Sequence, residues 1–413
     1  MTTQLSPTDT AGGSPRTPSL TAAEAAQIAD ALATSAAAGA TDRDLTRTHP
    51  IGLLTELAGT GLLGVTVPRS AGGSGLPLSV SADVLRRLAR GDANLAQLVL
   101  SHFVLLDIAS LAAEPDTLAL LHEVATGSGW LGNATAERGT AHVFDRRTSL
   151  TRRPDGTGVL SGRKFYATGA LGSTLFGVAA NLDGDPGHPV IAFVSPSDAG
   201  VAIDGDWTAF GQRTTASGSV HLIDVLVPWE RVIDLGELPV DPPRSPVGAY
   251  DQLLHAAIDV GIARAALEDG AAFVRERARP WVEADVERVA DEQLVQHRFG
   301  RLRALVAALE ALFARAGAAV DAVRTVPAPT EEALIEASLA VAEVKALAQE
   351  VGPEVATEVI ELGGTSSADE RHGLDRHWRN VRVHSLHDPA RWKYVHLGRH
   401  LLDGTAPPKH PLL

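Results

Sequence analysis

Three arginines and three histidines surround one tryptophan between residues 373 and 389, which read GLDRHWRNVRVHSLHDP. They are Arg376, Arg379 and Arg382 together with His377, His384 and His387. Imidazole groups titrate near neutral pH and can move protons in catalysis, whereas guanidinium groups bind carboxylates and phosphates. The segment could therefore be the wall of a catalytic pocket, a metal site, a basic surface or a structural salt-bridge network.

The metal and basic-surface interpretations are the weaker ones. Three protein ligands can hold a catalytic metal, but this histidine spacing fits no known ligand pattern, and the arginines between them would repel a divalent ion. Apolar residues alternate with the charges and indicate a partly buried segment: Leu374, Trp378, Val381, Val383, Leu386 and Trp392. Buried arginine and histidine need anionic or hydrogen-bonding partners, which a bound phosphate or Asp375 and Asp388 would provide. A structural salt-bridge network remains open.

Other candidate motifs are weaker. GTGLLG at residues 59–64 matches the dinucleotide pattern G-x-G-x-x-G, but that pattern is informative only between a strand and a helix. Here a helix precedes it and the strand-like VTVP follows, so we predict a helix end and a turn. Residues 205–228, 132–140 and 166–173 offer backbone amides and hydroxyls that could bind a planar heterocycle.

Three blocks of secondary structure must position these residues. Residues 21–125 are rich in Ala and Leu and predict helices, the first with a capping box from Thr21 to Glu24. Residues 126–240 hold short β-branched segments divided by Gly, Pro and Asp, which predict an antiparallel β domain. Residues 241–413 return to long helices at 3.6 periodicity, with a last helix at 389–402. The fold class is α+β, mainly α, and residues 1–20 predict a disordered leader.

Composition limits the function classes. The chain has 413 residues, no cysteine and a net charge of −14. The missing cysteines exclude disulfides, thiolate metal sites and cysteine nucleophiles. The acidic balance disfavours nucleic acid as a partner. No apolar run approaches the ~20 residues of a membrane helix, and the N-terminus lacks a secretory signal. We therefore expect a cytoplasmic protein without a membrane partner.

Taken together, these segments resemble the acyl-CoA dehydrogenase superfamily over nearly the whole chain from residue 50. Its N-terminal helical domain resembles LAGTGLLGVTVPRSAGGSGLPLSVSADVLRRLARGDANLA. Its middle β domain resembles LSGRKFYATGA and FGQRTTASGSVHLIDVLVP, and the Gly-Gly segment of its C-terminal four-helix bundle resembles VIELGGTSS. The order and spacing of these segments carry the resemblance, since no single motif decides it.

The sequence departs from true dehydrogenases of that superfamily. Those enzymes remove a proton beside a thioester carbonyl with a glutamate, often in a Tyr-Glu-Gly-Thr stretch, where this chain has SLHDP with His387. A second position for that base lies on a helix of the bundle, so an FAD-dependent acyl-CoA dehydrogenase stays an alternative. LDRHWRNVRVHSLHDPARWK is instead similar to the flavin-dependent monooxygenase branch, which includes dibenzothiophene monooxygenases and related two-component flavin hydroxylases.

That resemblance implies a reaction and its partners. Reduced flavin, with FMN first and FAD second, comes from a separate NAD(P)H:flavin reductase and reacts with O2 to form a C4a-hydroperoxyflavin. One oxygen atom then passes to a small aromatic, heteroaromatic or organosulfur substrate, for example one like indole. The resemblance does not say whether sulfur, nitrogen or carbon is oxygenated. It also implies a homotetramer with flavin between subunits.

The resemblance also assigns residues. Catalytic roles fall on residues that match the active-site histidines and polar positions of the branch: His387, His384, His102, Asn133 and Thr168. A satisfied histidine inside a helix pair is the structural alternative for His102. Thr168 stands where relatives carry serine, and its extra methyl makes its rotamers stiffer.

Cofactor contacts are implied for a second, overlapping set of residues: Asn133, Thr168, Trp207, Arg279, Arg277 and His387. Trp207 would form a wall against the isoalloxazine, with a core tryptophan as the alternative. Arg279 would reach the flavin phosphate of a neighbouring subunit, with Arg277 as its rival. No metal ligand is assigned. The remaining alternative function is a catalytically inert helical scaffold, which would bind no flavin.

Overall fold

The computed structural model describes residues 19–112, 114–236 and 244–410. The boundary predicted near residue 240 lies outside these residues, as does nearly all of the predicted leader. Leu20, placed in that leader, is buried, and its amide donates a hydrogen bond to Ser74 Oγ, 2.9 Å away. The chain is therefore already packed before the first helix.

The N-terminal part is helical, as predicted. Its helices are α1 (Ala22–Ala38), α2 (Ala40–Thr46), α3 (Ile51–Gly59), α4 (Leu78–Gly91), α5 (Ala93–Ala112) and α6 (Pro115–Thr126). Thr21 and Glu24 form the predicted capping box at the start of α1. The GTGLLG segment forms the end of α3 and a 3-10 turn, Leu62–Gly64. Residues 65–67 form bends, so the strand-like VTVP is not a strand, and residues 79–125 give three helices where two were predicted.

The middle part is one twisted sheet. Its strands are β1 (Leu131–Ala134), β2 (Ser149–Arg152), β3 (Thr157–Lys164), β4 (Leu175–Leu182), β5 (Pro189–Val194), β6 (Val201–Ile203), β7 (Val220–Pro228) and β8 (Val232–Asp234). The order is β6-β7-β3-β2-β4-β5-β8, with β1 beside β4. Most neighbours are antiparallel, as predicted, but β4 pairs in parallel with β1 and β2. Parallel neighbours need long connections: residues 135–174 separate β1 from β4, and residues 153–174 separate β2 from β4.

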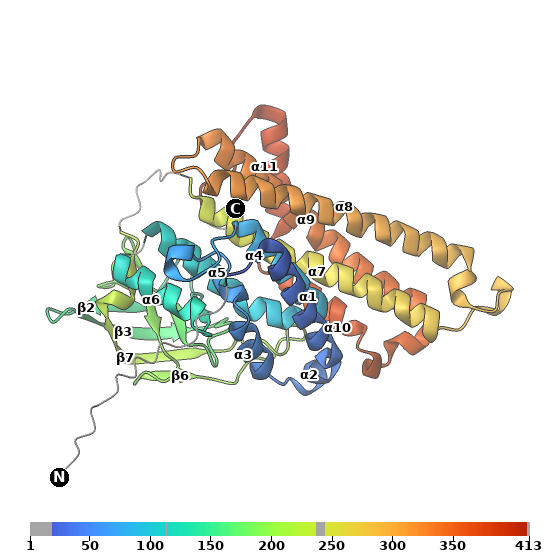
Figure 1. Ribbon diagram of the computed structural model, residues 1–413, viewed down its shortest axis with the longest axis horizontal. Helices are drawn as coiled ribbons and strands as arrows, with labels where there is room; N and C mark the ends of the chain where they lie inside the picture. Colours follow the sequence, from blue (N-terminus) through green and yellow to red (C-terminus); the bar gives the residue numbers. More distant parts are fainter. Residues whose placement is uncertain (1–18, 113, 237–243, 411–413) are drawn as a thin grey trace, which may run out of the picture.

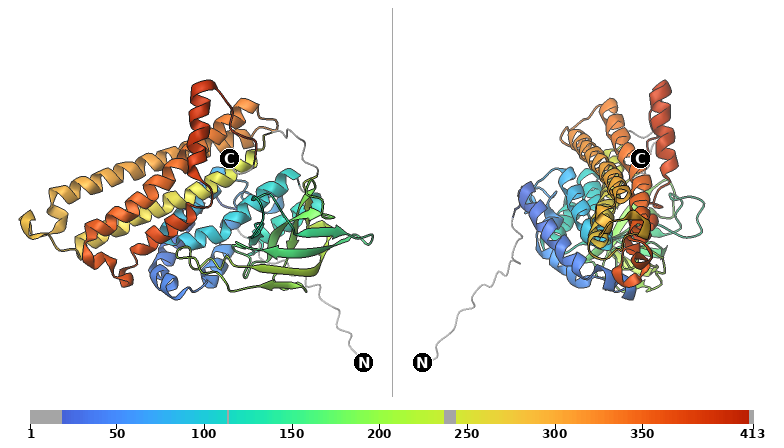
Figure 2. Two further views of the ribbon diagram at one scale, coloured as in Figure 1. Left: turned by 180° about the vertical axis from the view of Figure 1, so that it is seen from behind. Right: turned by 90° about the vertical axis from the view of Figure 1, so that its right-hand side faces the viewer.

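The C-terminal part is a helical bundle. It contains α7 (Pro246–Glu276), α8 (Gln293–Arg324), α9 (Glu331–Gly363), α10 (Asp375–His384) and α11 (Ala390–Asp403). The shorter α10 packs against α7 and α9 as the fourth member of the predicted bundle, and α11 packs on α9. Figures 1 and 2 show the sheet at one end of the molecule, the α7–α8 connection at the other, and α11 projecting from the side.

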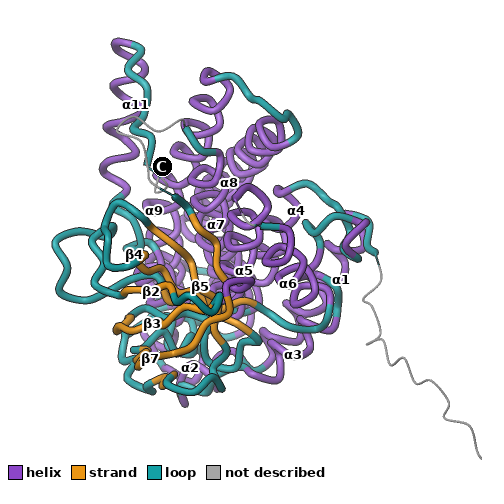
Figure 3. The backbone as a smooth tube through the Cα atoms, turned by 90° about the vertical axis from the view of Figure 1, so that its left-hand side faces the viewer, coloured by secondary structure: helices purple, strands orange, loops and turns teal. Residues whose placement is uncertain are grey.

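Two apolar layers hold these parts together. The larger one joins α1, α4 and α5 to α7, α8 and α9, with Leu85, Leu88, Tyr250 and Leu253 almost fully buried. A second layer lies between α5, α6 and one face of the sheet. Viewed from the sheet end in Figure 3, the helices lie behind and beside the strands.

Helix α5 is an exception to the expectation that the chain has no apolar run of membrane-spanning length. Contrary to the expectation that no apolar run is long enough, Ala93–Ala112 is long and apolar enough to cross a membrane. Most of that stretch is buried inside the protein, where α5 contacts α4, α7 and β1. It is the core helix of this part of the chain.

One close contact joins the sheet to α10. Gly211 lies in the loop before β7, and a Cβ at this position would overlap the backbone carbonyl of Arg379. Nothing lies within 4 Å of the equivalent position on Gly205, in the same loop.

We expect Gly211→Ala to lower the free energy of unfolding by about 1–3 kcal/mol, because the loop must shift away from α10. Gly205→Ala is the matched control and should stay within about 0.5 kcal/mol of the parent. Denaturant unfolding of both variants measures the difference. Equal stabilities would show that the loop does not dock tightly on α10.

Candidate active site

Helix α10 buries a polar face. Arg376, His377, Asn380 and His384 are all buried along one side of this ten-residue helix. The carboxylate of Asp269 on α7 accepts hydrogen bonds from Arg376 (2.9 Å) and His377 (2.8 Å). Burial raises the pKa of Asp269, but these two partners outweigh it and hold that pKa below its usual range. Arg376 therefore anchors α10 to α7 through its pairing with Asp269.

The C-terminal end of α10 leads into a buried chain of side chains. His384 Nδ1 lies 2.6 Å from Asp259 Oδ1, and His384 Nε2 lies 3.2 Å from His255 Nδ1. The other carboxylate oxygen of Asp259 lies 3.4 Å from Lys345 Nζ on α9. Both members of that ion pair are fully buried. Burial lowers the pKa of His384, and this effect outweighs the charge and hydrogen bond of Asp259, which raise it. The net lowering of the pKa favours a neutral imidazole.

His387 lies beside this chain. Its ring stacks on that of His255, with centroids 3.8 Å apart and planes 24° apart. His387 Nδ1 lies 3.0 Å from Asp388 Oδ2, and its side chain is 42% exposed. Burial lowers the pKa of His387, but the hydrogen bond and charge of Asp388, helped by Asp251, raise it above its ordinary value. His387 is thus the histidine of this cluster that is both accessible and able to carry charge.

A row of hydroxyls follows the loop before β7. Thr168 Oγ1 lies 2.7 Å from Ser217 Oγ, which donates to Thr215 Oγ1 at 2.8 Å. Thr215 Oγ1 in turn donates to the carbonyl of Gln212, which also accepts the indole N–H of Trp207 at 2.8 Å. The row fixes Thr168 and Trp207, both singled out from the sequence, in one network.

Within the part of the chain that the structure describes, several polar atoms around the same loop have no hydrogen-bond partner. They are both side-chain amide atoms of Gln212, the hydroxyl of Thr214 and Nε2 of His49, and all are buried. Gln212 also has a backbone φ of +50°, a conformation that costs energy in a residue with a side chain. A buried polar atom left unpaired costs about 1–3 kcal/mol, so these atoms mark a place where a polar ligand would be stabilised.

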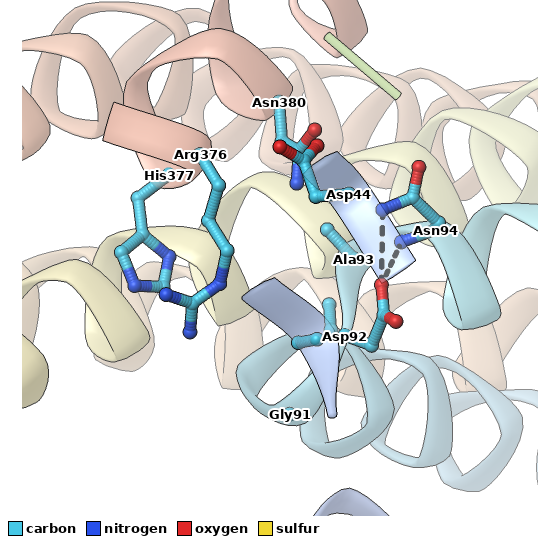
Figure 4. A pocket seen from close by; sticks show the side chains of 10 residues that line it. Asp44, Gly91, Asp92, Ala93, Asn94, Arg376, His377 and Asn380 are labelled. Carbon is cyan, nitrogen blue, oxygen red and sulfur yellow. Dashed lines mark hydrogen bonds between the residues drawn. The ribbon is translucent and has the colours of Figure 1, made fainter. Parts of the chain in front are cut away.

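Two asparagines hold this loop from outside the sheet. Asn380 Oδ1 on α10 accepts a hydrogen bond from the backbone N–H of Gln212 at 2.7 Å. Asn94 Oδ1 on α5 accepts one from the backbone N–H of Thr214 at 3.2 Å. Figure 4 shows the small polar pocket between them, with Asn380 and its α10 neighbours opposite Asn94 and Asp92. The loop is therefore positioned jointly by the N-terminal helices and the bundle.

The remaining predicted residues are spread over the molecule. His102 on α5 is fully buried, and its ring nitrogens contact the carbonyl of Leu63 (2.9 Å) and the amide of Leu131 (3.1 Å). Burial lowers its pKa to about 4. This arrangement matches the structural alternative for His102, and a catalytic role for it remains a prediction. Asn133 is half-buried on β1, and its backbone N–H donates a hydrogen bond to the backbone carbonyl of Thr168 at 2.9 Å.

Arg277 and Arg279 do not meet the other site residues within this chain. Both are exposed and follow the end of α7. That connection lies at the opposite end of the bundle from the sheet (Figure 1). A contact between either arginine and a ligand at the β7 loop therefore requires a second copy of the chain. Within the described residues, no group of three or more His, Cys, Asp or Glu could hold a metal ion.

Sequence patterns and overall shape identify the family. Residues 22–128 match the acyl-CoA dehydrogenase N-terminal domain, and residues 253–392 match the acyl-CoA dehydrogenase C-terminal domain. Dibenzothiophene monooxygenase of Rhodococcus qingshengii is 32% identical over 393 residues, covering 92% of this chain and 93% of that protein. The chain belongs to the acyl-CoA dehydrogenase superfamily.

Within the superfamily, the similar proteins include flavin monooxygenases. The probable FMNH2-dependent monooxygenase SfnC of Pseudomonas putida is 28% identical, covering 92% of this chain and 95% of that protein. FMN-bound TdsC from Paenibacillus sp. A11-2 superposes with a TM-score of 0.87 at 28% identity, covering 94% of this chain and all of TdsC. These similarities bear out the resemblance to the monooxygenase branch of the superfamily.

The residues present fit a flavin. Isoalloxazine carries carbonyl and N–H groups that need hydrogen-bond partners, and the unpaired amide of Gln212 and hydroxyl of Thr214 supply both donors and acceptors. Trp207 offers an aromatic face beside them, tied to the loop by its indole N–H. Gln212, Thr214, Thr168 and Trp207 are therefore the residues of this chain that would hold the ring system.

Residues outside the predicted set complete the cluster. Asp251, His255 and Asp259 follow one another at intervals of four along α7, so they share one face of that helix. Lys345 faces them from α9. Titratable groups at helical spacing inside an otherwise apolar stretch, DQLLHAAIDVG, are the sequence signal that could have found them. Asn380 and Gln212 give no such signal, because isolated amides are common on surfaces.

We predict that Asp388→Asn lowers the pKa of His387, because the variant removes the charge that raises it. A histidine whose pKa is raised by folding stabilises the fold below its unfolded pKa, and this stabilisation is lost as pH rises through the folded pKa. In the variant, that loss should occur at lower pH. NMR titration of ¹³C-labelled histidine measures the shift, and His387→Gln identifies the signal. Asp403→Asn, an exposed change on α11, is the control. An unchanged pKa would exclude Asp388 as the partner that sets it.

Proposed function

We propose that the protein is the oxygenase of a two-component monooxygenase, which takes reduced flavin from a separate NAD(P)H:flavin reductase. In this reaction one atom of O2 enters the substrate, the other leaves as water, and the flavin returns oxidised. The observation that carries the proposal is the 32% identity with dibenzothiophene monooxygenase across 92% of the chain. The accessible histidine of SLHDP, in the stretch where dehydrogenases often carry their glutamate, agrees with it.

FMN is the proposed cofactor, with FAD as the alternative. SfnC is named as FMNH2-dependent, and TdsC has been solved with FMN and with FMN and indole together. The proposed substrates are small aromatic, heteroaromatic or organosulfur compounds, in keeping with indole in TdsC and dibenzothiophene in the curated relatives. When bound, the reduced flavin supplies the two electrons that activate oxygen.

The side chains of this chain divide the remaining work. Thr168 and Asn133 would orient the ring system from the sheet, since the backbones of these two residues are directly hydrogen-bonded. His387 would hold or deliver a proton at its Nε2 near the reacting oxygen, because its Nδ1 is taken by Asp388. Because the His387 side chain is 42% exposed in a single chain, water would be kept from it only by a bound ligand or a neighbouring subunit, and this exclusion would suppress peroxide release.

A homotetramer is part of the proposal. The α7–α8 connection, the start of α8 and the end of α11 expose large apolar side chains that a subunit interface would cover: Trp281, Val282, Leu294, Leu401 and Leu402. Arg279, or its rival Arg277, would then reach flavin phosphate from the neighbouring subunit. A cytoplasmic location is proposed as well, because reduced flavin, which is oxidised by O2 in free solution, must be made in the same compartment.

Arg279→Ala should raise the Kd for reduced FMN by about 10–100-fold, the value of a lost charge-assisted hydrogen bond. Arg277→Ala is the matched control, two residues away and equally exposed, and should change the Kd less than about 2-fold. Anaerobic titration of reduced FMN measures both. The opposite pattern would assign the phosphate to Arg277, and no change in either variant would remove both from the site.

The function is tested by turnover under ¹⁸O2 with a flavin reductase, NADH and a panel of dibenzothiophene, indole and a short alkyl sulfinate. We expect one ¹⁸O atom in at least one product, with peroxide as a minor outcome. In His387→Ala, flavin binding should persist while the ratio of peroxide to product rises about 10-fold or more, the lower range of general acid–base contributions. Complete recovery of the consumed O2 as peroxide for every panel member in the parent protein would contradict the proposal. Bleaching of bound FAD by an acyl-CoA would favour the dehydrogenase instead.

A further inference from the structure

Proton counting fixes the tautomers in the buried histidine chain. Because Asp259 Oδ1 accepts from His384 Nδ1, that nitrogen carries the hydrogen. A neutral His384 then has a lone pair on Nε2, so His255 Nδ1 must donate to it. His255 Nε2 is left as an acceptor, 3.9 Å from Asp251 Oδ1. Burial raises the pKa of Asp251 to about 6, so this carboxyl takes up a proton more easily than an exposed aspartate.

The Asp259 end of this chain is held by two partners. Asp259 is shared between His384 and Lys345, and all three side chains are almost completely buried. At the other end, His255 is buried on α7 one helical turn from both Asp251 and Asp259. A buried charge stripped of its partner is strongly destabilised, so the chain has one stable arrangement.

Only one of the stacked histidines can be charged. Two imidazolium rings 3.8 Å apart would repel each other. Burial lowers the pKa of His255 well below its ordinary value, and nearby positive charges lower it further. His387 instead has Asp388 as a direct partner. When this pair of rings takes up one proton, the positive charge therefore resides on His387.

We propose that His255 is a positioning residue for the oxygen transfer, held by the Asp259–His384 chain so that its neutral ring fixes the orientation of His387. This inference rests on the proposed function. His384 is then the link in the chain, since both of its ring nitrogens are occupied, and His387 is the histidine that meets the reacting oxygen. In this proposal Asp259, His384 and His255 act through His387, so that His384, predicted from the resemblance to be catalytic, would be a positioning residue.

The charges that face His387 come from several elements. Asp251 on α7, Lys345 on α9 and Asp388 beside the ring act on His387 directly, whereas Lys393 on α11 acts on Asp388, and Asp259 is paired with Lys345. Neutralising Asp259 leaves Lys345 as an uncompensated positive charge near His387. The pH at which His387 loses its proton should then fall.

The first test compares two variants at position 255 and follows the coupling ratio, which is product formed per O2 consumed, as a function of pH. His255→Phe keeps an aromatic ring against His387 but cannot donate to His384, whereas His255→Asn keeps a donor nitrogen near the position of Nδ1. We expect His255→Phe to lower the coupling ratio about 5-fold, the value of one lost hydrogen bond, with the Kd for reduced FMN unchanged. His255→Asn should recover part of the loss, and His297→Phe, an exposed change on α8, should cause none.

The second test moves the pH profile. Asp259→Asn should shift the midpoint of the coupling ratio to lower pH, whereas a purely structural role would lower the ratio equally at every pH. Because Asp259→Asn leaves Lys345 unpaired and can fail to fold, Asp259→Asn with Lys345→Met removes both charges together. That double variant should fold and still couple less well than the parent.

A third readout does not depend on turnover. ¹⁵N NMR of the flavin-free protein with labelled histidine should show His384 and His255 as neutral Nδ1–H tautomers, with His255→Asn and His384→Gln identifying their signals. Nε2–H tautomers, or unchanged coupling in His255→Phe at every pH, would overturn the inference. If the parent protein itself transfers no oxygen while the tautomers are as stated, the proposed function fails and the hydrogen-bonded chain stands as a structural feature.

Discussion

The burial of a polar helix is the constraint on which the rest of this structure depends. Helix α10 places an arginine, two histidines and an asparagine inside the protein, and burying such groups without partners is costly. The partners come from two other segments: Asp269 and Asp259 from α7, and the backbone amide of Gln212 from the β7 loop. Satisfying these groups therefore fixes the loop and the bundle relative to each other.

This arrangement separates two kinds of chemistry. The unpaired polar atoms of Gln212 and Thr214 lie on the loop and suit a ligand with hydrogen-bonding edges. The histidines lie beyond it on the bundle, where Lys345 balances the charge of Asp259 and a protonated His387 balances that of Asp388. Because α10 carries both Asn380, which holds the loop, and His384, one turn later, a single helix sets the distance between the two. A pocket built in this way can hold one reactive histidine in a defined protonation state without placing other charges against the ligand.

The sequence predicted the three-part layout because hydrophobic periodicity changes from helical to strand-like and back, and this signal survives without tertiary information. The family resemblance predicted four site residues that the structure places in two clusters. His387 and His384 lie in the histidine cluster, and Thr168 and Trp207 lie in the hydrogen-bonded row before β7. The parallel pairing of β4 was not predictable, since it depends on long connections and not on strand composition. Asp259, Lys345 and His255 were missed because their importance lies in contacts between helices more than 80 residues apart in the chain. The place of Arg279 depends on assembly, which a single sequence does not reveal.

The most direct measurement of the central claim is the reaction of the reduced complex with oxygen. The protein would be mixed anaerobically with reduced FMN, or with reduced FAD, and then with oxygenated buffer while absorbance is followed by stopped flow. The account predicts a protein-dependent absorbance intermediate that outlives the oxidation of free reduced flavin and decays faster when a substrate is present. Reoxidation of both flavins at the free-flavin rate, with no such intermediate, would contradict it.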